Sequence, residues 1–127
     1  MAIISASIDE ETLSELDFLC KSLSFSGRSE AIRAGIRSLA AENKSVDGLT
    51  GVMKAVLLLV HEENAEKSAS HLAHEFEDVV STHMHSNLKR GKCLEIFVLD
   101  GSAERIRALY RAAKASKKMD YARLVVP

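Results

Sequence analysis

The chain of 127 residues lacks tryptophan, and its single proline, Pro127, is the last residue. Without internal proline there is no proline-rich linker and no polyproline ligand. Two cysteines, Cys20 and Cys93, are too few for the disulfide framework of a small secreted protein. We therefore expect a reducing, cytoplasmic location.

The sequence also lacks a charge excess and a long hydrophobic run. Its 17 Lys and Arg against 18 Asp and Glu give a net charge of −1, which excludes a generally basic nucleic-acid coat protein but allows a local DNA contact. The longest apolar run, residues 55–60, is too short to cross a bilayer. The N-terminus lacks the basic start of a signal peptide, so we expect no membrane partner.

The first part of the chain predicts a short strand and two helices. Within residues 3–8, Ile4, Ala6 and Ile8 alternate with Ile3, Ser5 and Ser7, a period of two. So short a strand must pair with something, such as a second copy of itself. Asp9 is a suitable N-cap for a helix with Leu13, Leu16 and Cys20 on one face. A second helix is expected to end by residue 43, and its predicted inner face consists of Ala31, Ile32, Gly35, Ile36, Leu39 and Ala40.

The remainder of the chain predicts four strands and two helices. Strands are expected over residues 52–60, 79–87, 93–99 and 121–126, and helices over residues 62–76 and after Asp100-Gly101-Ser102. The order β-α-β-β-α-β is that of a ferredoxin-like fold. The predicted fold class is therefore α+β, with a dimeric strand-helix-helix domain (1–45), a polar linker (46–51) and a βαββαβ domain (52–127).

A group of imidazole and thiol side chains marks the second domain. His83 and His85 are two residues apart on a predicted strand and point the same way, and Cys93 begins the next strand. His74 lies near the end of the preceding helix. Nitrogen and sulfur donors together suit nickel, copper or zinc, so the pattern favours a transition-metal site.

Catalysis is not expected. The glycines are scattered and form no phosphate-binding loop. Cys93 begins a strand rather than a helix, so it lacks the helix N-terminus that activates many nucleophilic thiols.

The segments ISASIDEETLSELDFL and GRSEAIRAGIRSL resemble the ribbon-helix-helix DNA-binding family. The resemblance implies an antiparallel ribbon of two chains in the DNA major groove, with Ile3, Ser5 and Ser7 facing the bases. Arg28 and Ser29, at the start of the second helix, would meet a phosphate. Relatives often carry Arg or Lys at the position of Ile3, so a strand-helix-helix used only for dimerisation is the alternative.

The whole chain resembles the NikR-type nickel-responsive regulators. The resemblance rests on the order of domains and on the spacing of His74, His85 and Cys93-Leu94-Glu95. It implies an ACT-like second domain, a homotetramer built as a dimer of dimers, operator DNA as partner, and nickel or another divalent transition metal as cofactor. It further implies that His85 and Cys93 of one chain and His74 of a neighbouring chain bind the metal, with Glu95 hydrogen-bonded nearby.

One implied ligand position is occupied by Asn87, where the family has a second histidine. An amide oxygen is a poor ligand for planar nickel beside a thiolate. His83 shares the face of Asn87, but if Asn87 lies opposite Cys93, His83 is four residues further along, about 13 Å. His61 lies near a family Tyr-x-His but is expected to be an exposed histidine at a helix start, auxiliary at most.

Three interpretations of the metal site remain open. The chain binds nickel weakly through His74, His85, Cys93 and water, or it binds another metal in a tetrahedral set that includes His83. In the third, it has lost metal sensing and responds to a small-molecule ligand in the ACT-like domain.

Overall fold

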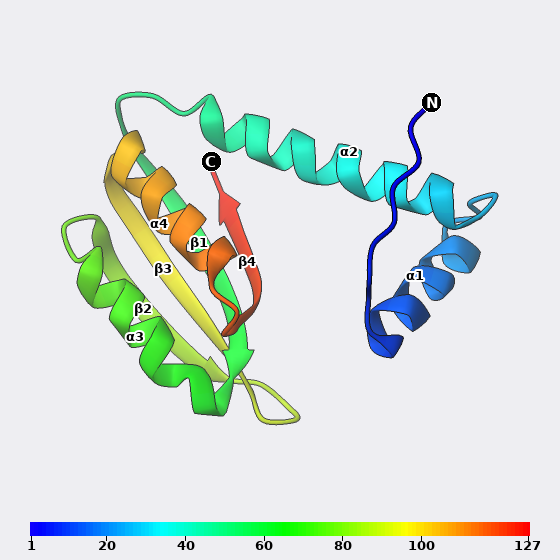
Figure 1. The fold of residues 1–127 in the computed structure, drawn as a ribbon. Coiled ribbons are helices and arrows are strands. Elements are labelled where there is room, and N and C mark those ends of the chain that lie inside the picture. The colour runs from blue at the N-terminus through cyan, green and yellow to red at the C-terminus, as the bar shows by residue number, and fades with distance from the viewer. The chain divides into compact units, whose positions relative to one another are not determined.

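The computed structural model describes residues 1–127, which form two compact units, residues 1–44 and residues 45–127. Figure 1 shows the helices of the first unit and the sheet with its two helices in the second. None of the helices is long and apolar enough to cross a membrane.

The first unit consists of helix α1 (Glu10–Ser22) and most of helix α2 (Arg28–Asp47). The predicted N-cap is confirmed, because the Asp9 carboxylate accepts a hydrogen bond from the backbone N–H of Thr12 at 2.7 Å. The Arg28 guanidinium donates to both carboxylate oxygens of Asp17, at 2.9 and 3.1 Å, and so joins the start of α2 to α1.

The first unit has almost no core of its own. Ala31 is its only buried residue, whereas Phe18 and Leu39 are 69% and 61% exposed. Of the predicted inner face of the second helix, only Ala31 is buried within a single chain, so burial of the rest requires a second chain and stays a prediction. Residues 1–9 form no strand either, since a lone strand has no neighbour to accept its backbone hydrogen bonds.

Helix α2 continues to Asp47, four residues beyond its predicted end at residue 43. The extension is held by the second unit, where Val46 is buried in the core. Arg107 donates to the carbonyl oxygens of Val46 and Leu49, at 3.2 and 3.0 Å, which satisfies the end of the helix. Tertiary packing thus overrides the local polar signal that predicted an earlier end.

The second unit is a four-stranded antiparallel sheet with two helices on one face (Figure 1). The predicted order of elements is confirmed, and the sheet order is β2-β3-β1-β4. Its elements are strand β1 (Val52–Glu62), a 3-10 turn (Glu63–Ala65), helix α3 (Glu66–Glu75), strand β2 (Val80–Asn87), strand β3 (Lys92–Ser102), helix α4 (Ala103–Ala115) and strand β4 (Met119–Val125).

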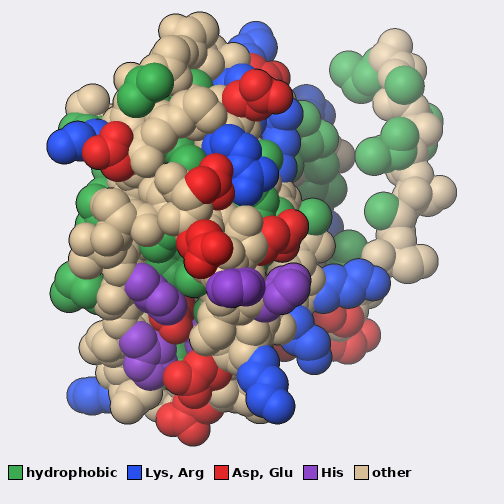
Figure 2. Space-filling view, turned by 90° about the vertical axis from the view of Figure 1, so that its left-hand side faces the viewer, with side chains coloured by type: hydrophobic (Ala, Val, Ile, Leu, Met, Phe, Trp, Pro, Cys, Tyr) green, Lys and Arg blue, Asp and Glu red, His purple; other side chains and the backbone are tan.

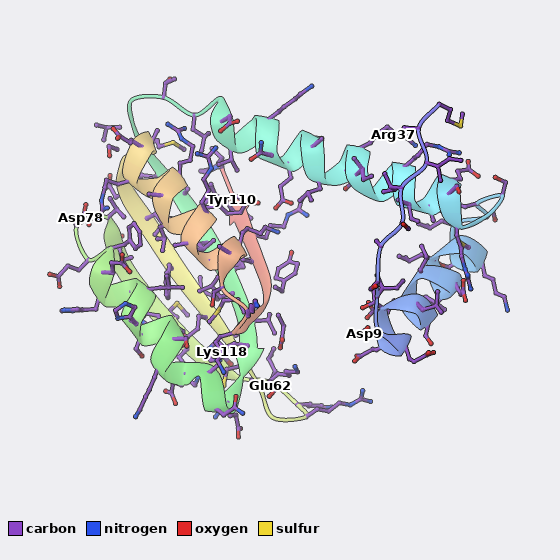
Figure 3. The ribbon with its side chains drawn as sticks, in the orientation of Figure 1. Asp9, Arg37, Glu62, Asp78, Tyr110 and Lys118 are labelled. Atoms are coloured by element: carbon purple, nitrogen blue, oxygen red, sulfur yellow. The ribbon has the colours of Figure 1, made fainter.

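The core lies between the helices and one face of the sheet. Alternate residues of β1 and β3, including Leu57, Leu59 and Phe97, are fully buried there. They pack against the buried apolar residues of α3, its C-cap and α4, which are Ala69, Leu72, Phe76, Ile106, Leu109, Tyr110 and Ala113. Tyr110 is labelled on α4 in Figure 3.

Neither helix of the second unit covers the opposite face of the sheet, which we call the open face. Most of its residues are apolar and only half-buried or exposed, and they pair across neighbouring strands: Val56, Leu58, Val60, Leu94, Ile96, Val98, Met84, Tyr121 and Val125. A contiguous apolar surface of this kind marks an interaction site in a folded protein.

Gly101 in β3 has no room for a side chain. A Cβ atom there would lie 2.6 Å from Cγ1 of Val79, which is itself buried. We expect Gly101→Ala to lower the free energy of unfolding by about 1–3 kcal/mol through overpacking, measured by urea denaturation. Gly35→Ala in helix α2 is the control; a Cβ there meets nothing within 4 Å, so the substitution should stabilise by roughly 0.5–1 kcal/mol.

Asp78 links the turn after α3 to the start of α4 (Figure 3). Arg105 donates two hydrogen bonds of 2.9 Å to its carboxylate, and these hold the pKa of Asp78 below its usual value. A carboxyl with a lowered pKa stabilises the fold above its unfolded-state pKa, and this contribution is lost as the pH falls through the folded-state pKa. We expect the Asp78→Asn protein to be less stable than the wild type at neutral pH and equally stable in strong acid. Melting temperatures of the two proteins across this pH range would measure the difference. Parallel pH profiles for the two proteins would contradict this expectation.

Candidate metal centre

Three adjacent strands bring the metal-donor residues to one end of the sheet, on the face that packs against the helices. Cys93 of β3 lies opposite Asn87 of β2 on one side and opposite His61 of β1 on the other. Glu95 lies one step further along the same face, opposite His85. The register therefore places these donors on neighbouring positions of one surface.

The Cys93 thiol is buried, with 2% of the residue exposed. Its Sγ atom donates a weak hydrogen bond to Oδ1 of Asn87, at a separation of 3.7 Å. Burial raises the pKa of Cys93, and the nearby carboxylates of Glu63, Glu66 and Glu95 raise it further. A metal ion at this thiol must therefore displace a proton that is held more firmly than usual.

Glu95 is a buried carboxylate, 1% exposed, at the centre of the group. The Nε2 atom of His83 donates a hydrogen bond to its Oε2 atom at 2.8 Å. The His83 ring also packs edge-on against Phe97, with ring centroids 4.6 Å apart. His83 lies opposite Phe97, four residues from Asn87, so its ring is committed to Glu95 and lies away from Cys93.

His61 is fully buried at the end of β1, so the prediction of an exposed histidine at a helix start was wrong. The strand extends two residues beyond its predicted end at residue 60. The alternation of buried residues through Ala55, Leu57 and Leu59 simply continues to His61. Following this period of two for one more step would have revealed the burial from sequence.

The remaining candidate histidines face solvent. His85 is exposed on β2, and the His74 side chain on α3 is 80% exposed, with Nδ1 3.7 Å from a carboxylate oxygen of Glu77. Figure 2 shows histidine side chains gathered on one face of the second unit, with acidic side chains among them. His74 and His85 are therefore open to groups from outside this chain.

Within this conformation, no three His, Cys, Asp or Glu side chains are grouped closely enough to hold a metal ion. The chemistry of the donors nevertheless suits a transition-metal ion, because a thiol, imidazoles and a carboxylate are all common ligands and share one surface here. Ion binding therefore requires side chains to rotate, or a ligand from a neighbouring chain such as the solvent-facing His74.

The predicted DNA-contacting residues lie at the surface of the first unit. Ile3, Ser5 and Ser7 are exposed in the segment that precedes α1, and Arg28 and Ser29 begin α2. The Arg28 guanidinium is paired with Asp17, so a phosphate there would compete with a carboxylate.

A four-stranded antiparallel sheet with both helices on one face is consistent with an ACT-like domain, and its cysteine and histidines suit a metal-responsive regulator. Residues 54–126 match the family described as the NikR C-terminal nickel-binding domain. The chain belongs to this family of nickel-responsive regulators. The family is not enzymatic, and this chain is not an enzyme.

The curated relatives align over nearly the whole chain. A protein named for nickel-responsive regulation in Halobacterium salinarum is 35% identical over 99% of this chain and 93% of its own length. Another, from Desulfovibrio desulfuricans, is 34% identical over 86% of this chain and 80% of its own length. A solved structure of an uncharacterized Thermotoga maritima protein shares the fold, with a TM-score of 0.54 and 16% identity over 60% of this chain and 98% of that one.

Proposed function

We propose that this chain is a cytoplasmic transcriptional regulator that binds operator DNA in response to nickel or a related divalent transition metal. Residues 1–45 form its DNA-binding domain, and residues 52–127 carry the metal and hold the assembly together. The observation that carries the proposal is the register of β2 and β3. It sets Asn87 beside the Cys93 thiol and His85 on the adjacent position, in a chain whose family binds nickel.

The metal centre of this proposal uses Cys93 and His85 of one chain and His74 of a neighbour. Asn87 and His83 are the remaining candidate ligands, and Glu95 is a hydrogen-bonding neighbour. The exposure of the His74 side chain supports a role between chains, since a second chain can reach it. Metal would favour the arrangement of chains in which both DNA-binding domains meet their half-sites.

The exposed apolar side chains of the first unit support a ribbon-helix-helix dimer. Ile4 and Ile8 precede α1, and Ile36 and Leu39 lie on α2; all are largely exposed in the single chain. Pairing the segments 3–8 of two chains would supply the missing backbone hydrogen bonds and cover these side chains. Ile3, Ser5 and Ser7 would then form the face of the ribbon that meets DNA.

The open face of the sheet supports association of the second units. Apolar surface on this scale is costly to leave in water. Two dimers joined through their second units would form the proposed homotetramer.

Asn87 occupies a position where the family has a histidine ligand, and this difference favours one alternative function. In this alternative, the chain keeps the regulator architecture but has lost metal sensing, and a small molecule bound in the ACT-like domain controls DNA binding. Unchanged DNA affinity with and without nickel, copper, cobalt or zinc would favour it.

The proposal is tested by DNA binding of the reduced full-length chain, with fluorescence anisotropy and the DNA upstream of its own gene as probe. We expect nickel to change the affinity by roughly 5- to 150-fold, the usual range of allosteric coupling. No specific binding to this DNA in either state would contradict the proposal and would point to a structural oligomerisation role.

A matched pair of variants, Ser5→Glu and Ser14→Glu, tests the DNA-binding face. Both add one negative charge to an exposed position of the first unit, Ser5 before α1 and Ser14 on α1 itself. Ser5→Glu should abolish DNA binding, because a carboxylate would face the phosphates and base edges of the groove. Ser14→Glu should weaken binding far less. Metal binding should be unchanged in both variants, because both positions lie in the first unit.

A further inference from the structure

The Nε2 atom of His61 is the one buried side-chain nitrogen or oxygen in the chain that has no hydrogen-bond partner. The imidazole is 0% exposed, so bulk solvent does not reach it. An unsatisfied polar atom in a core costs about 1–3 kcal/mol. Such a nitrogen needs a physical explanation, and binding of a functional ligand to it is one.

The other ring nitrogen of His61 is already engaged. Nδ1 lies 2.6 Å from the backbone carbonyl oxygen of Glu62, and because a carbonyl oxygen only accepts, Nδ1 carries the hydrogen. In the neutral ring the lone pair then lies on Nε2. Histidines that bind metals show this same arrangement, with one nitrogen held by a carbonyl or carboxylate and the other presented to the ion.

The Nε2 atom of His61 lies near a carboxylate oxygen, and the strand register places a cysteine opposite it. Nε2 is 3.7 Å from Oε1 of Glu95, and the ladder of β1 and β3 sets His61 directly opposite Cys93. Metal–nitrogen and metal–oxygen bonds of about 2.0–2.2 Å each allow one ion to bind both Nε2 and Oε1 at that separation. A hydrogen bond between these two atoms is too long at 3.7 Å.

His61 therefore differs from His83, the other histidine that could compensate for Asn87. His83 gives its Nε2 hydrogen to Oε2 of Glu95 at 2.8 Å and lies opposite Phe97, not Cys93. The two imidazoles thus face different oxygens of one carboxylate. Only His61 leaves its Nε2 atom without a hydrogen-bond partner and lies opposite Cys93.

We infer that a tetrahedral divalent ion binds this chain within one subunit, to Nε2 of His61, Sγ of Cys93 and a carboxylate oxygen of Glu95. This set shares only Cys93 with the planar nickel set, which takes His74 from a neighbouring chain. The inference rests on the proposed metal response and names the ligands and the class of ion. A thiolate and a carboxylate neutralise a divalent cation, so the buried site carries no net charge. One nitrogen, one sulfur and one oxygen suit a tetrahedral ion such as zinc or cobalt better than planar nickel.

Binding requires one rearrangement. The Cys93 Sγ atom faces Asn87, so its side chain must turn toward β1 to meet the ion. Asn87 accepts the thiol hydrogen only while the thiol is protonated, and release of that proton to solvent when the metal binds removes the contact.

The test uses cobalt as a spectroscopic probe in the reduced full-length chain. Tetrahedral cobalt bound to a thiolate gives intense visible bands and a sulfur-to-cobalt charge-transfer band. We expect His61→Gln to lower cobalt affinity by at least about 100-fold, which is more than the loss of a hydrogen bond to a ligand costs. The control variant, His83→Gln, should keep the charge-transfer band. Wild-type affinity and spectrum in His61→Gln would overturn the inference.

A second variant tests the inference if His61→Gln fails to fold. His61→Cys keeps a donor at the position, and we expect its charge-transfer absorbance per cobalt to rise, because two thiolates then bind the ion. An unchanged band in a folded His61→Cys protein would overturn the inference as well. Failure of the proposed function looks different: the wild type itself would show no charge-transfer band with any ion.

Discussion

Replacing Cys93 by alanine is expected to lower nickel and cobalt affinity by at least about 100-fold. The thiolate is the donor that every candidate ligand set for this chain shares, and its loss removes both a strong bond and the negative charge that offsets the cation. Titration followed by thiolate-to-metal absorption measures the effect directly. The metal dependence of DNA binding should disappear with it.

The chain provides a matched control for this substitution. Cys20 is the other free cysteine and is half-buried on α1 in the first unit. Cys20→Ala removes the same thiol group but should leave metal affinity and spectrum unchanged. A Cys93→Ala protein that is folded by circular dichroism and still shows a metal-dependent change in DNA affinity would contradict the assignment of Cys93 as a ligand.

A lysine in the middle of the open face is expected to break the proposed tetramer into smaller species. Ile96 lies between Met84 and Leu58 on the adjacent strands and is half-buried in the single chain. If this face is an interface, Ile96→Lys places an unpaired charge in it, and an unpaired buried charge costs about 3–5 kcal/mol. Sedimentation velocity at several concentrations would measure the dissociation.

Ala108→Lys is the control for the open face. Ala108 is exposed on α4, which lies on the opposite side of the sheet, and a lysine there changes net charge by the same amount. A tetramer that persists in Ile96→Lys would show that the open face is not the interface. Metal affinity measured on the same samples would show whether any ligand must come from a neighbouring chain.

Local pattern was enough to predict most elements of the second unit. The periods of 2 and 3.6 in the apolar residues mark its strands and helices, and the apolar face of α4, which includes Ile106 and Leu109, is buried. These patterns are reliable because each element packs one face against a core within the same chain. The first unit lacks such a core, so the same patterns predicted a strand and a buried helix face that one chain does not form.

The sequence by itself determined which donor residues the second unit carries and, through the spacing of His74, His85, Cys93 and Glu95, the family to which the chain belongs. Only the tertiary structure decided how these donors are used. It buried His61 opposite Cys93 and bound His83 to Glu95. The period of two along β1 carries the burial of His61, but not the residue that it faces. That register joins residues far apart in the chain, here 32 positions for His61 and Cys93, and such a pairing leaves no local periodic signal.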